Sequence, residues 1–308
     1  MKRPRGSNHA RKDNSFYSSY SLLIGGRTDE VWMKDPTSFR SDLAKHVEQS
    51  HPEVSPSLND APPSALNGVG SGFFHNSRSL MTIDVYADIA CPWCYVGRAR
   101  LKDALAQRSD LGVTLRWRPF QLQPDLPADG ADFRTVLERK FGSWTRAERM
   151  FDRIREMGGE EGLTFNFDAI EVAPNTADAH RLVLWAQSKT TSSLSPGAED
   201  EDGPVGADAM ATTLFRAYFT DGRNVSDRAV LADCAAEAGF DADEARAMLG
   251  SDAHADAVRE SQQQAQRRGV TGVPCYVFND EQAVTGAQPT DVFLEVFDAV
   301  EAESAGQS

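Results

Sequence analysis

The chain has 308 residues, of which 40% are hydrophobic, and a formal net charge of -14. This length is enough for one large domain or two smaller ones. Residues 1–80 carry 10 Lys and Arg against 8 Asp and Glu, so the acidic excess lies entirely in residues 81–308. Such an acidic body argues against nucleic acid or an anionic membrane as the main partner, because both attract positive surfaces.

Apolar runs are short along the chain. The longest near the start, Leu22–Ile24, falls far below the roughly 20 residues of a membrane-spanning helix and the roughly 7–15 of a signal-peptide core. Four cysteines, only two of them close together, do not form the disulfide framework of a small secreted protein. We therefore expect a cytoplasmic protein whose close cysteine pair performs redox or metal chemistry.

The first 80 residues differ from the rest in composition. Ser, Asn, Pro and Gly recur there, and apolar residues follow neither a helical nor a strand period. We expect residues 1–80 to form a mostly disordered N-terminal extension. A short helix at Ser38–Gln49 is compatible with the spacing of Phe39, Leu43 and Val47.

A clear pattern of elements begins at Met81. Ile83–Tyr86 predicts a short strand, and Cys91 then opens a helix in which Leu101 and Leu105 fall four apart. Val113–Trp117 alternates as a second strand should. These pieces predict a βαβ unit with a short connection through the helix.

A long stretch with helical periods follows, at about 130–268. The expected helices cover Asp132–Met157, Thr176–Gln187, Asp208–Thr220, Ser226–Ala238 and Asp252–Arg268. Between two of them, an acidic run rich in Ser, Pro and Gly predicts a surface loop at 188–206.

The strand pattern returns after Pro274. Cys275–Asn279 and Gln282–Thr285 predict a hairpin around Asp280–Glu281, and a final helix places its apolar residues on one side. The order βαβ, helical insertion, ββα predicts an α/β protein with a thioredoxin fold at 81–303, interrupted by a helical subdomain.

The Cys91–Cys94 segment, Cys-Pro-Trp-Cys, stands between a strand and a helix. A helix N-terminus carries partial positive charge and unpaired N–H groups, which stabilise a thiolate and lower the pKa of Cys91. Pro92 suits the first helical turn. Cys94 lies within the same turn and can attack a mixed disulfide at Cys91. The sequence therefore predicts Cys91 as the nucleophile and Cys94 as the resolving thiol.

Half of a zinc site is the alternative for the cysteine pair. Such a site needs a second pair of Cys or His ligands at close spacing, and the sequence has none. We therefore expect no metal. Cys234 and Cys275 are each expected to be small buried residues.

Val273-Pro274 is the second motif. A proline at the start of a strand is by itself an ordinary edge or turn residue. Combined with the earlier cysteine pair and the hairpin and helix that follow, it matches the place where thioredoxin folds hold a cis-proline against the cysteines. Val273 would then present its backbone to an extended peptide.

These features resemble the DsbA-like thioredoxin superfamily, and most closely its FrnE-type branch. The matching stretches are Asp88–Gly97, Trp117–Leu122, Pro174–Thr176, Ala179–Leu182, Leu214–Phe219, Gly269–Pro274 and Thr285–Pro289. The resemblance covers about 82–300. It implies dithiol–disulfide exchange with protein or low-molecular-weight thiol substrates, without a required cofactor and with glutathione as a conceivable co-substrate. A homodimer is compatible with it.

The resemblance also implies a set of site residues. Catalytic roles fall on Cys91, Cys94 and Pro274, and substrate contacts on Pro92, Trp93, Val273 and Asn175. Proton transfer falls on Asp88 and His180. For Asn175 the alternative is a helix cap, for Asp88 a cap or an exposed position, and for His180 a structural place in a helix. Cys275 departs from the family pattern after the proline, and a third sulfur near the site is the alternative to its being a small buried residue.

Three functions are compatible with these residues. The first is a thiol–disulfide oxidoreductase of the DsbA/FrnE type. The second is a glutathione-dependent isomerase or transferase of the 2-hydroxychromene-2-carboxylate isomerase or kappa-class glutathione transferase type, whose members typically carry Ser at the first position of the motif. The third is a non-catalytic redox sensor or chaperone-like protein.

Overall fold

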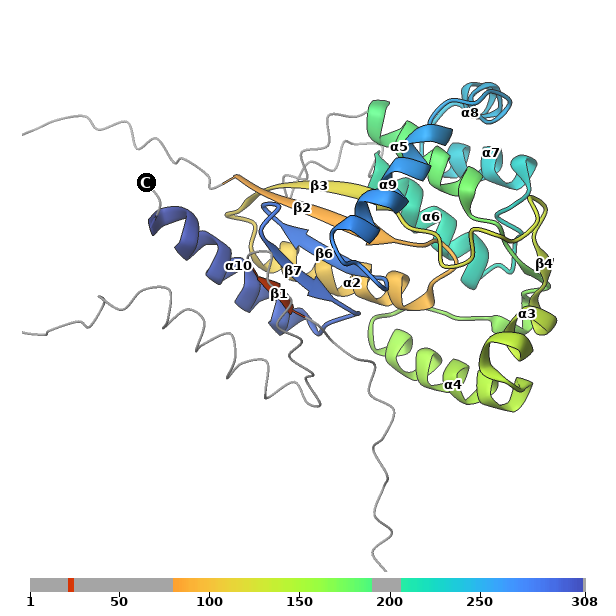
Figure 1. The fold of residues 1–308 in the computed structure, drawn as a ribbon, viewed down its shortest axis with the longest axis horizontal. Helices are drawn as coiled ribbons and strands as arrows, with labels where there is room; N and C mark the ends of the chain where they lie inside the picture. The colour runs from red at the N-terminus through yellow and green to blue at the C-terminus, as the bar shows by residue number, and fades with distance from the viewer. Residues whose placement is uncertain (1–21, 25–79, 190–205, 307–308) are drawn as a thin grey trace, which may run out of the picture.

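The computed structural model describes residues 22–24, 80–189 and 206–306. Five strands in the described part form one mixed sheet in the order β1-β7-β6-β2-β3. Figure 1 shows this sheet at one end of the molecule and most of the helices at the other. The α/β class and the order of elements predicted from the sequence are confirmed.

The βαβ unit forms the centre of the sheet. Strand β2 (Leu80–Ala87) is followed by α2 (Pro92–Gln107) and then by β3 (Gly112–Pro119), which pairs with β2 in parallel. Residues of β2 are buried on both faces because helices and loops cover the sheet on both sides. The chain therefore leaves β2 at its carboxyl end and enters α2 directly at Cys91.

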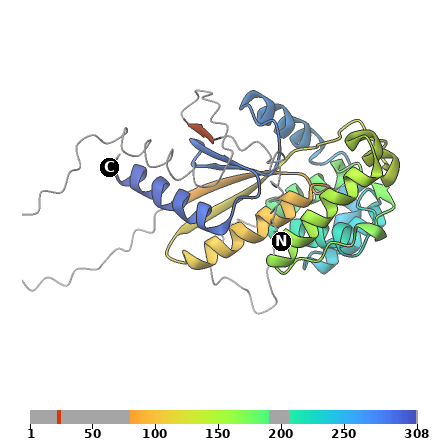
Figure 2. The same ribbon diagram turned by 90° about the horizontal axis from the view of Figure 1, so that it is seen from below.

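The ββα unit completes the sheet. Strands β6 (Cys275–Phe278) and β7 (Gln282–Thr285) form the predicted antiparallel hairpin, and β6 also pairs with β2. Helix α10 (Thr290–Gly306) runs alongside α2 on the same face of the sheet, as Figure 2 shows from below. A side chain on β6 therefore points either toward α2 or toward the opposite face.

The region between β3 and β6 is helical. Its elements are β4 (Ala131–Asp132), α3 (Phe133–Phe141), α4 (Trp144–Glu160), the 3₁₀ turn η1 (Phe167–Ala169), β5 (Val172–Ala173), α5 (Ala177–Lys189), α6 (Ala207–Phe219), α7 (Arg228–Glu237), α8 (Ala242–Leu249) and α9 (Ala255–Arg267). Tyr95 of α2 packs against Phe165, Phe215 and Phe219 of this region, so one continuous core joins it to the sheet.

Three details of the helical region differ from the prediction. The helix expected at Asp132–Met157 is two helices, because Gly142 adopts φ +81° and ends α3 in the left-handed region. Helix α8 was not predicted, although Asp241 caps it through the N–H groups of the next turn. Strands β4 and β5 also form a two-stranded ribbon in a region where no strand was expected.

Part of the N-terminal region contributes to the sheet. Strand β1 (Leu22–Ile24) pairs antiparallel with β7 at the sheet edge, with Leu22 opposite Val284. The helix expected at Ser38–Gln49 and almost all of the acidic loop at 188–206 lie outside the described residues. In the part of the chain that the structure describes, every helix is too short or too polar to cross a membrane.

Candidate functional site

The start of α2 holds both cysteines of the motif. Cys91 is the N-cap residue of the helix, with extended backbone angles, and Pro92 occupies the first helical position. The Cys91 N–H donates to the Asp88 carbonyl oxygen at 3.0 Å, which folds the turn between β2 and α2. Pro92 fits there because the first helical N–H groups have no partner within a helix.

Cys91 is surrounded by groups that stabilise its thiolate. A hydrogen bond from the Cys94 thiol lowers the pKa of Cys91 most, and the N–H groups of Cys94 and Trp93 lower it further. Burial and the negative charge of Asp88 oppose this effect without reversing it. In the protonated form the Cys91 thiol also donates to the Val273 carbonyl oxygen at 3.6 Å, a contact that favours the thiol and not the thiolate. The net effect of these groups is to lower the pKa of Cys91, which is the direction expected for a thiol at a helix N-terminus.

Cys94 has the opposite character. Burial raises its pKa well above the usual range, and the hydrogen bond and charge of Cys91 raise it further. The two thiols thus differ because the Cys94 thiol and the helix N–H groups donate to Cys91, whereas burial dominates at Cys94. Both are free thiols in this structure.

The Val273-Pro274 peptide bond is cis, as expected from the motif. Pro274 packs against the cysteine helix at Gly97, where an added methyl group would lie only 3.2 Å from the proline ring. Val273 thus lies next to Cys91, and strand β6 begins immediately after Pro274. The structure therefore brings together the two motifs that are most distant in the sequence.

Asp88 is a buried carboxylate beside the cysteine turn. It accepts hydrogen bonds from the N–H groups of Leu122 at 2.7 Å and Ala90 at 3.2 Å. Its oxygen lies 3.4 Å from His180 Nε2, which is also buried. Burial alone would raise the pKa of Asp88, but the contacts with His180, Leu122 and Thr176 outweigh it and hold the pKa below the usual range.

Both polar atoms of the Asn175 side chain form hydrogen bonds within the protein. Its Oδ1 accepts from the Ala177 N–H at 3.0 Å and caps the start of α5, and its Nδ2 donates to the Leu126 carbonyl at 2.7 Å. Gln121 Nε2 also donates to Oδ1 at 3.3 Å. The capping alternative raised by the sequence is therefore present, and Asn175 fixes the loop that follows β3.

A small cavity opens beside Asp88. Its volume is about 60 Å³, and it lies between the cysteine turn and the helical region. The lining is mainly apolar, with one lysine: Asp88, Ala90, Leu122, Gln123, Phe133, Val136, Leu137, Lys140, Ala173, Pro174, Thr176 and Tyr218. Trp93 is half-buried and packs against the same core. Small-molecule sites usually measure about 300–1,000 Å³, so this cavity suits a side chain better than a large ligand.

Cys275 is a buried residue, as predicted, and the alternative of a third sulfur close to the site is not met. Its side chain is fully buried among Tyr86, Phe120 and Val277 on one face of the sheet, whereas Tyr276 belongs to the core that contains Cys91 and Cys94. Successive residues of a strand point to opposite faces, which explains the separation. Burial raises the pKa of Cys275 to about 12.

Tyr276 is the residue that the sequence reasoning missed. Period two from Pro274 would have placed it on the face of β6 that looks toward α2. Cys234, in α7, is buried as predicted, and burial raises its pKa to about 11.

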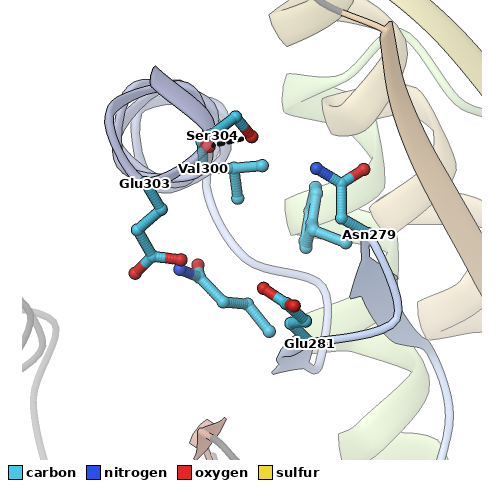
Figure 3. A pocket seen from close by; sticks show the side chains of 7 residues that line it. Asn279, Glu281, Val300, Glu303 and Ser304 are labelled. Atoms are coloured by element: carbon cyan, nitrogen blue, oxygen red, sulfur yellow. Dashed lines mark hydrogen bonds between the residues drawn. The ribbon is translucent and has the colours of Figure 1, made fainter. Parts of the chain in front are cut away.

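A larger cavity of about 130 Å³ lies elsewhere, between α10 and the turn from β6 to β7. Figure 3 shows Glu281 and Asn279 from the turn and Val300, Glu303 and Ser304 from α10 around it. The Asn279 side chain accepts from the Thr82 N–H at the start of β2, whereas the cysteines follow the end of that strand. This cavity is therefore remote from the thiols.

Metal ligands do not gather at the site. Within residues 80–189 and 206–306, no three His, Cys, Asp or Glu side chains are grouped so that they could hold a metal ion. The chemistry available to the described groups is that of two unequal thiols, a buried carboxylate and a histidine.

A comparison with models of protein families shows the family to which this chain belongs. Residues 82–298 match the family model of the DSBA-like thioredoxin domain. The chain belongs to this family. The match contains the cysteine motif, the helical region and the cis-proline, so the family and its fold follow for the whole described body from β2 to α10.

Two of the similar proteins are named as an oxidoreductase and as an isomerase, and a third is uncharacterised. A probable DsbA oxidoreductase from Streptomyces coelicolor is 33% identical, with a TM-score of 0.63 over 72% of this chain and 91% of that one. The 2-hydroxychromene-2-carboxylate isomerase of Sphingobium xenophagum is 27% identical over 70% of this chain and 97% of its own length. The uncharacterised protein YwbO of Bacillus subtilis is 26% identical, over 68% and 92%.

Proposed function

We propose that this protein is a thiol–disulfide oxidoreductase that uses Cys91 and Cys94. The observation that carries the proposal is the arrangement of two unequal thiols at the start of α2, because the Cys94 thiol and the helix N–H groups lower the pKa of Cys91 while burial raises that of Cys94. A thiol with a lowered pKa that attacks and a partner with a raised pKa that stays protonated until the second step are the two components of stepwise exchange.

The reaction begins at Cys91. Its thiolate attacks one sulfur of a substrate disulfide, forms a Cys91–substrate disulfide and releases the other substrate sulfur as a thiolate. Cys94 then loses its proton and attacks the Cys91 sulfur, which releases the second substrate thiolate and leaves a Cys91–Cys94 disulfide. The substrate gains two electrons and the protein loses two, and the reverse order of steps oxidises a substrate dithiol.

Asp88 and His180 are proposed to move the proton of Cys94. Because hydrogen bonds keep the pKa of Asp88 low, its carboxylate is ionised at neutral pH and serves as a relay. His180 Nε2, 3.4 Å away, is the next group along this route. The path lies inside the protein, since both side chains are buried.

Substrates are proposed to be extended peptide segments or small thiols at the Val273 edge. The Val273 carbonyl faces Cys91, so a segment bound there would lie beside the reactive sulfur. Pro92 and the half-buried Trp93 flank the same sulfur on α2. Asn175 supports this cleft indirectly by fixing the loop after β3. Glutathione is a candidate small co-substrate, and no bound cofactor is needed.

The test is a comparison of dithiol-exchange rates in the full-length protein and two variants. We expect Cys91→Ser to abolish exchange and Cys94→Ala to trap the mixed disulfide at Cys91. Full exchange activity in Cys91→Ser would refute the proposal. Mass spectrometry of the trapped adduct identifies the cysteine that attacks.

A glutathione-dependent isomerase is the second candidate, favoured by the similarity to the Sphingobium enzyme over nearly all of that protein's length. Such an activity does not need Cys94 as a resolving thiol. Tight glutathione binding together with isomerisation of an aromatic substrate that survives Cys94→Ala would favour it. The cavity of about 60 Å³ beside Asp88 is small for that class of substrate.

A further inference from the structure

Tyr276 carries a buried hydroxyl group that has no hydrogen-bond partner within the described residues. Its side chain is fully buried in β6, two residues after the cis-proline. A buried hydroxyl normally has a partner, because leaving one unpaired is costly. Phenylalanine would fill the same space without this cost, so the hydroxyl itself calls for an explanation.

The hydroxyl is directed at the cysteine helix. An added methyl group on Gly97 would lie 2.3 Å from the Tyr276 oxygen, so this oxygen rests against the backbone of α2. Cys94 lies three residues before Gly97, and residues three apart share one face of a helix. The Tyr276 hydroxyl therefore lies on the face of α2 that carries Cys94, about one turn further along.

The charged and acidic groups around the Tyr276 hydroxyl also indicate Cys94 as its relevant neighbour. Burial raises the pKa of Tyr276 well above its usual range, and among the nearby acidic groups Cys94 contributes most to this rise, ahead of Cys275 and Cys91. Arg100 is the nearby cation, but its guanidinium group already donates to Glu161 and to the Ala287 carbonyl. Cys94 is thus the acidic group that most affects the Tyr276 hydroxyl.

We propose that the Tyr276 hydroxyl donates a hydrogen bond to the sulfur of Cys94 when that sulfur becomes negatively charged in the resolving step. This inference rests on the proposed function and adds a residue to it. In the dithiol form Cys94 is a neutral thiol and the hydroxyl has no partner. Once Cys94 gives up its proton, the hydroxyl stabilises the thiolate that attacks the Cys91 mixed disulfide.

The two steps can be timed separately with a symmetrical aromatic disulfide whose thiolate is coloured. Attack by Cys91 releases the first coloured thiolate, and attack by Cys94 on the mixed disulfide releases the second. We expect Tyr276→Phe to leave the first release unchanged and to slow the second about tenfold, the effect of losing one hydrogen bond to a charged group.

The matched control is Tyr86→Phe. Tyr86 lies on the neighbouring strand, also buried, but on the opposite face with Cys275. We expect both releases to keep their wild-type rates in this variant. Thermal unfolding supplies the second readout: Tyr276→Phe should be at least as stable as the wild type, because it loses an unpaired buried hydroxyl.

The outcomes separate this inference from the proposed function. Slowing of the second release alone, in a variant of undiminished stability, supports it. If the wild type and Tyr276→Phe release both thiolates at equal rates, the inference is wrong and the oxidoreductase stands. If the wild type releases no second thiolate, the proposed function fails first, and the inference fails with it.

Discussion

The start of α2 and the start of β6 each contain a cysteine, and the two regions give it opposite properties. Cys91 is 4% exposed and Cys275 is 0% exposed, so both are buried. Yet the pKa of Cys91 is lowered by the Cys94 thiol and by helix N–H groups, while burial raises that of Cys275 to about 12. Burial alone therefore makes a thiol inert, and oriented donors are what make a buried thiol reactive.

The substitution of Cys91 should have the largest effect on the rate of dithiol exchange, and it tests this comparison most strongly. We expect Cys91→Ser to reduce the rate of dithiol exchange by about a thousandfold or more, because the hydroxyl group is not ionised where a thiolate is needed. The measurement is the steady-state reduction of a model disulfide. An equal loss in Cys275→Ala would contradict the separation of the two regions.

The reactivity of the two thiols toward an alkylating reagent gives the next largest contrast. Alkylation follows the thiolate, so its rate rises as pH passes through the pKa of each group. The midpoint for Cys91 should fall below the value of about 8.5 for a free cysteine, whereas native Cys275 should stay unmodified until far above it. Peptide mapping by mass spectrometry after timed quenching distinguishes the sites. Faster labelling of Cys275 in the folded protein would overturn the account.

Gly97 tests the close approach between α2 and β6. We expect Gly97→Ala to destabilise the fold by about 2 kcal/mol, since the new methyl group would meet the Tyr276 oxygen at 2.3 Å and Pro274 at 3.2 Å. The double variant with Tyr276→Phe should recover part of this loss, because the closest contact is removed while those with Pro274 at 3.2 Å and the Ala287 Cα at 3.3 Å remain. Denaturant unfolding measures both. No recovery in the double variant would show that the clash lies elsewhere.

A substitution at Asp88 tests how its negative charge affects the pKa of Cys91 and the stability of the fold. Its negative charge raises the pKa of Cys91, so Asp88→Asn should lower that pKa and speed the first attack severalfold at mildly acidic pH. Because folding lowers the pKa of Asp88, its ionised form stabilises the native state above the unfolded pKa of about 4, and this is lost as pH falls through the folded pKa. We therefore expect Asp88→Asn to cost about 2 kcal/mol at pH 7 and progressively less in acid.

A slower first attack in Asp88→Asn would be evidence against a repulsive carboxylate. Urea unfolding of the two proteins at several pH values provides the stability comparison. A gap in stability that widens toward acid would contradict the sign of the Asp88 shift.

The smallest expected effect is that of Cys275→Ala. The variant should lose about 1 kcal/mol of stability through a small cavity and keep the wild-type exchange rate within about twofold. The same activity assay and unfolding titration serve for this measurement. A clear fall in activity at unchanged stability would bring Cys275 back to the site.

Much of this arrangement could be predicted from the sequence, because the signals are local. The conformation of each motif depends on a few neighbouring residues, both for Cys91–Cys94 at its strand-to-helix junction and for Val273-Pro274. The structure brings the two motifs together, with 3.6 Å between the Cys91 sulfur and the Val273 carbonyl oxygen. The hairpin at β6 and β7 followed the predicted alternation.

The remainder depended on contacts between distant segments. Gly142 splits a stretch whose apolar period continues across it, so the break depends on a left-handed residue that periodicity does not register. Asp88 contacts the Leu122 N–H and His180, which lie far along the chain. The sequence allowed Asp88 and His180 to be named as separate candidates, but it did not predict that they are in contact. Cys275 is buried as predicted, and the alternative of a third sulfur near the site could be decided only once strand alternation had placed it on the face opposite to Tyr276.

The central claim is that Cys91 and Cys94 form one reversible redox pair while Cys275 and Cys234 take no part. The most direct test is a titration of the purified protein across glutathione redox buffers, in which free thiols are trapped and mapped by mass spectrometry. The account predicts a single two-electron transition confined to Cys91 and Cys94, which disappears in Cys91→Ser and in Cys94→Ser. The absence of any transition, or one that includes Cys275, would contradict it.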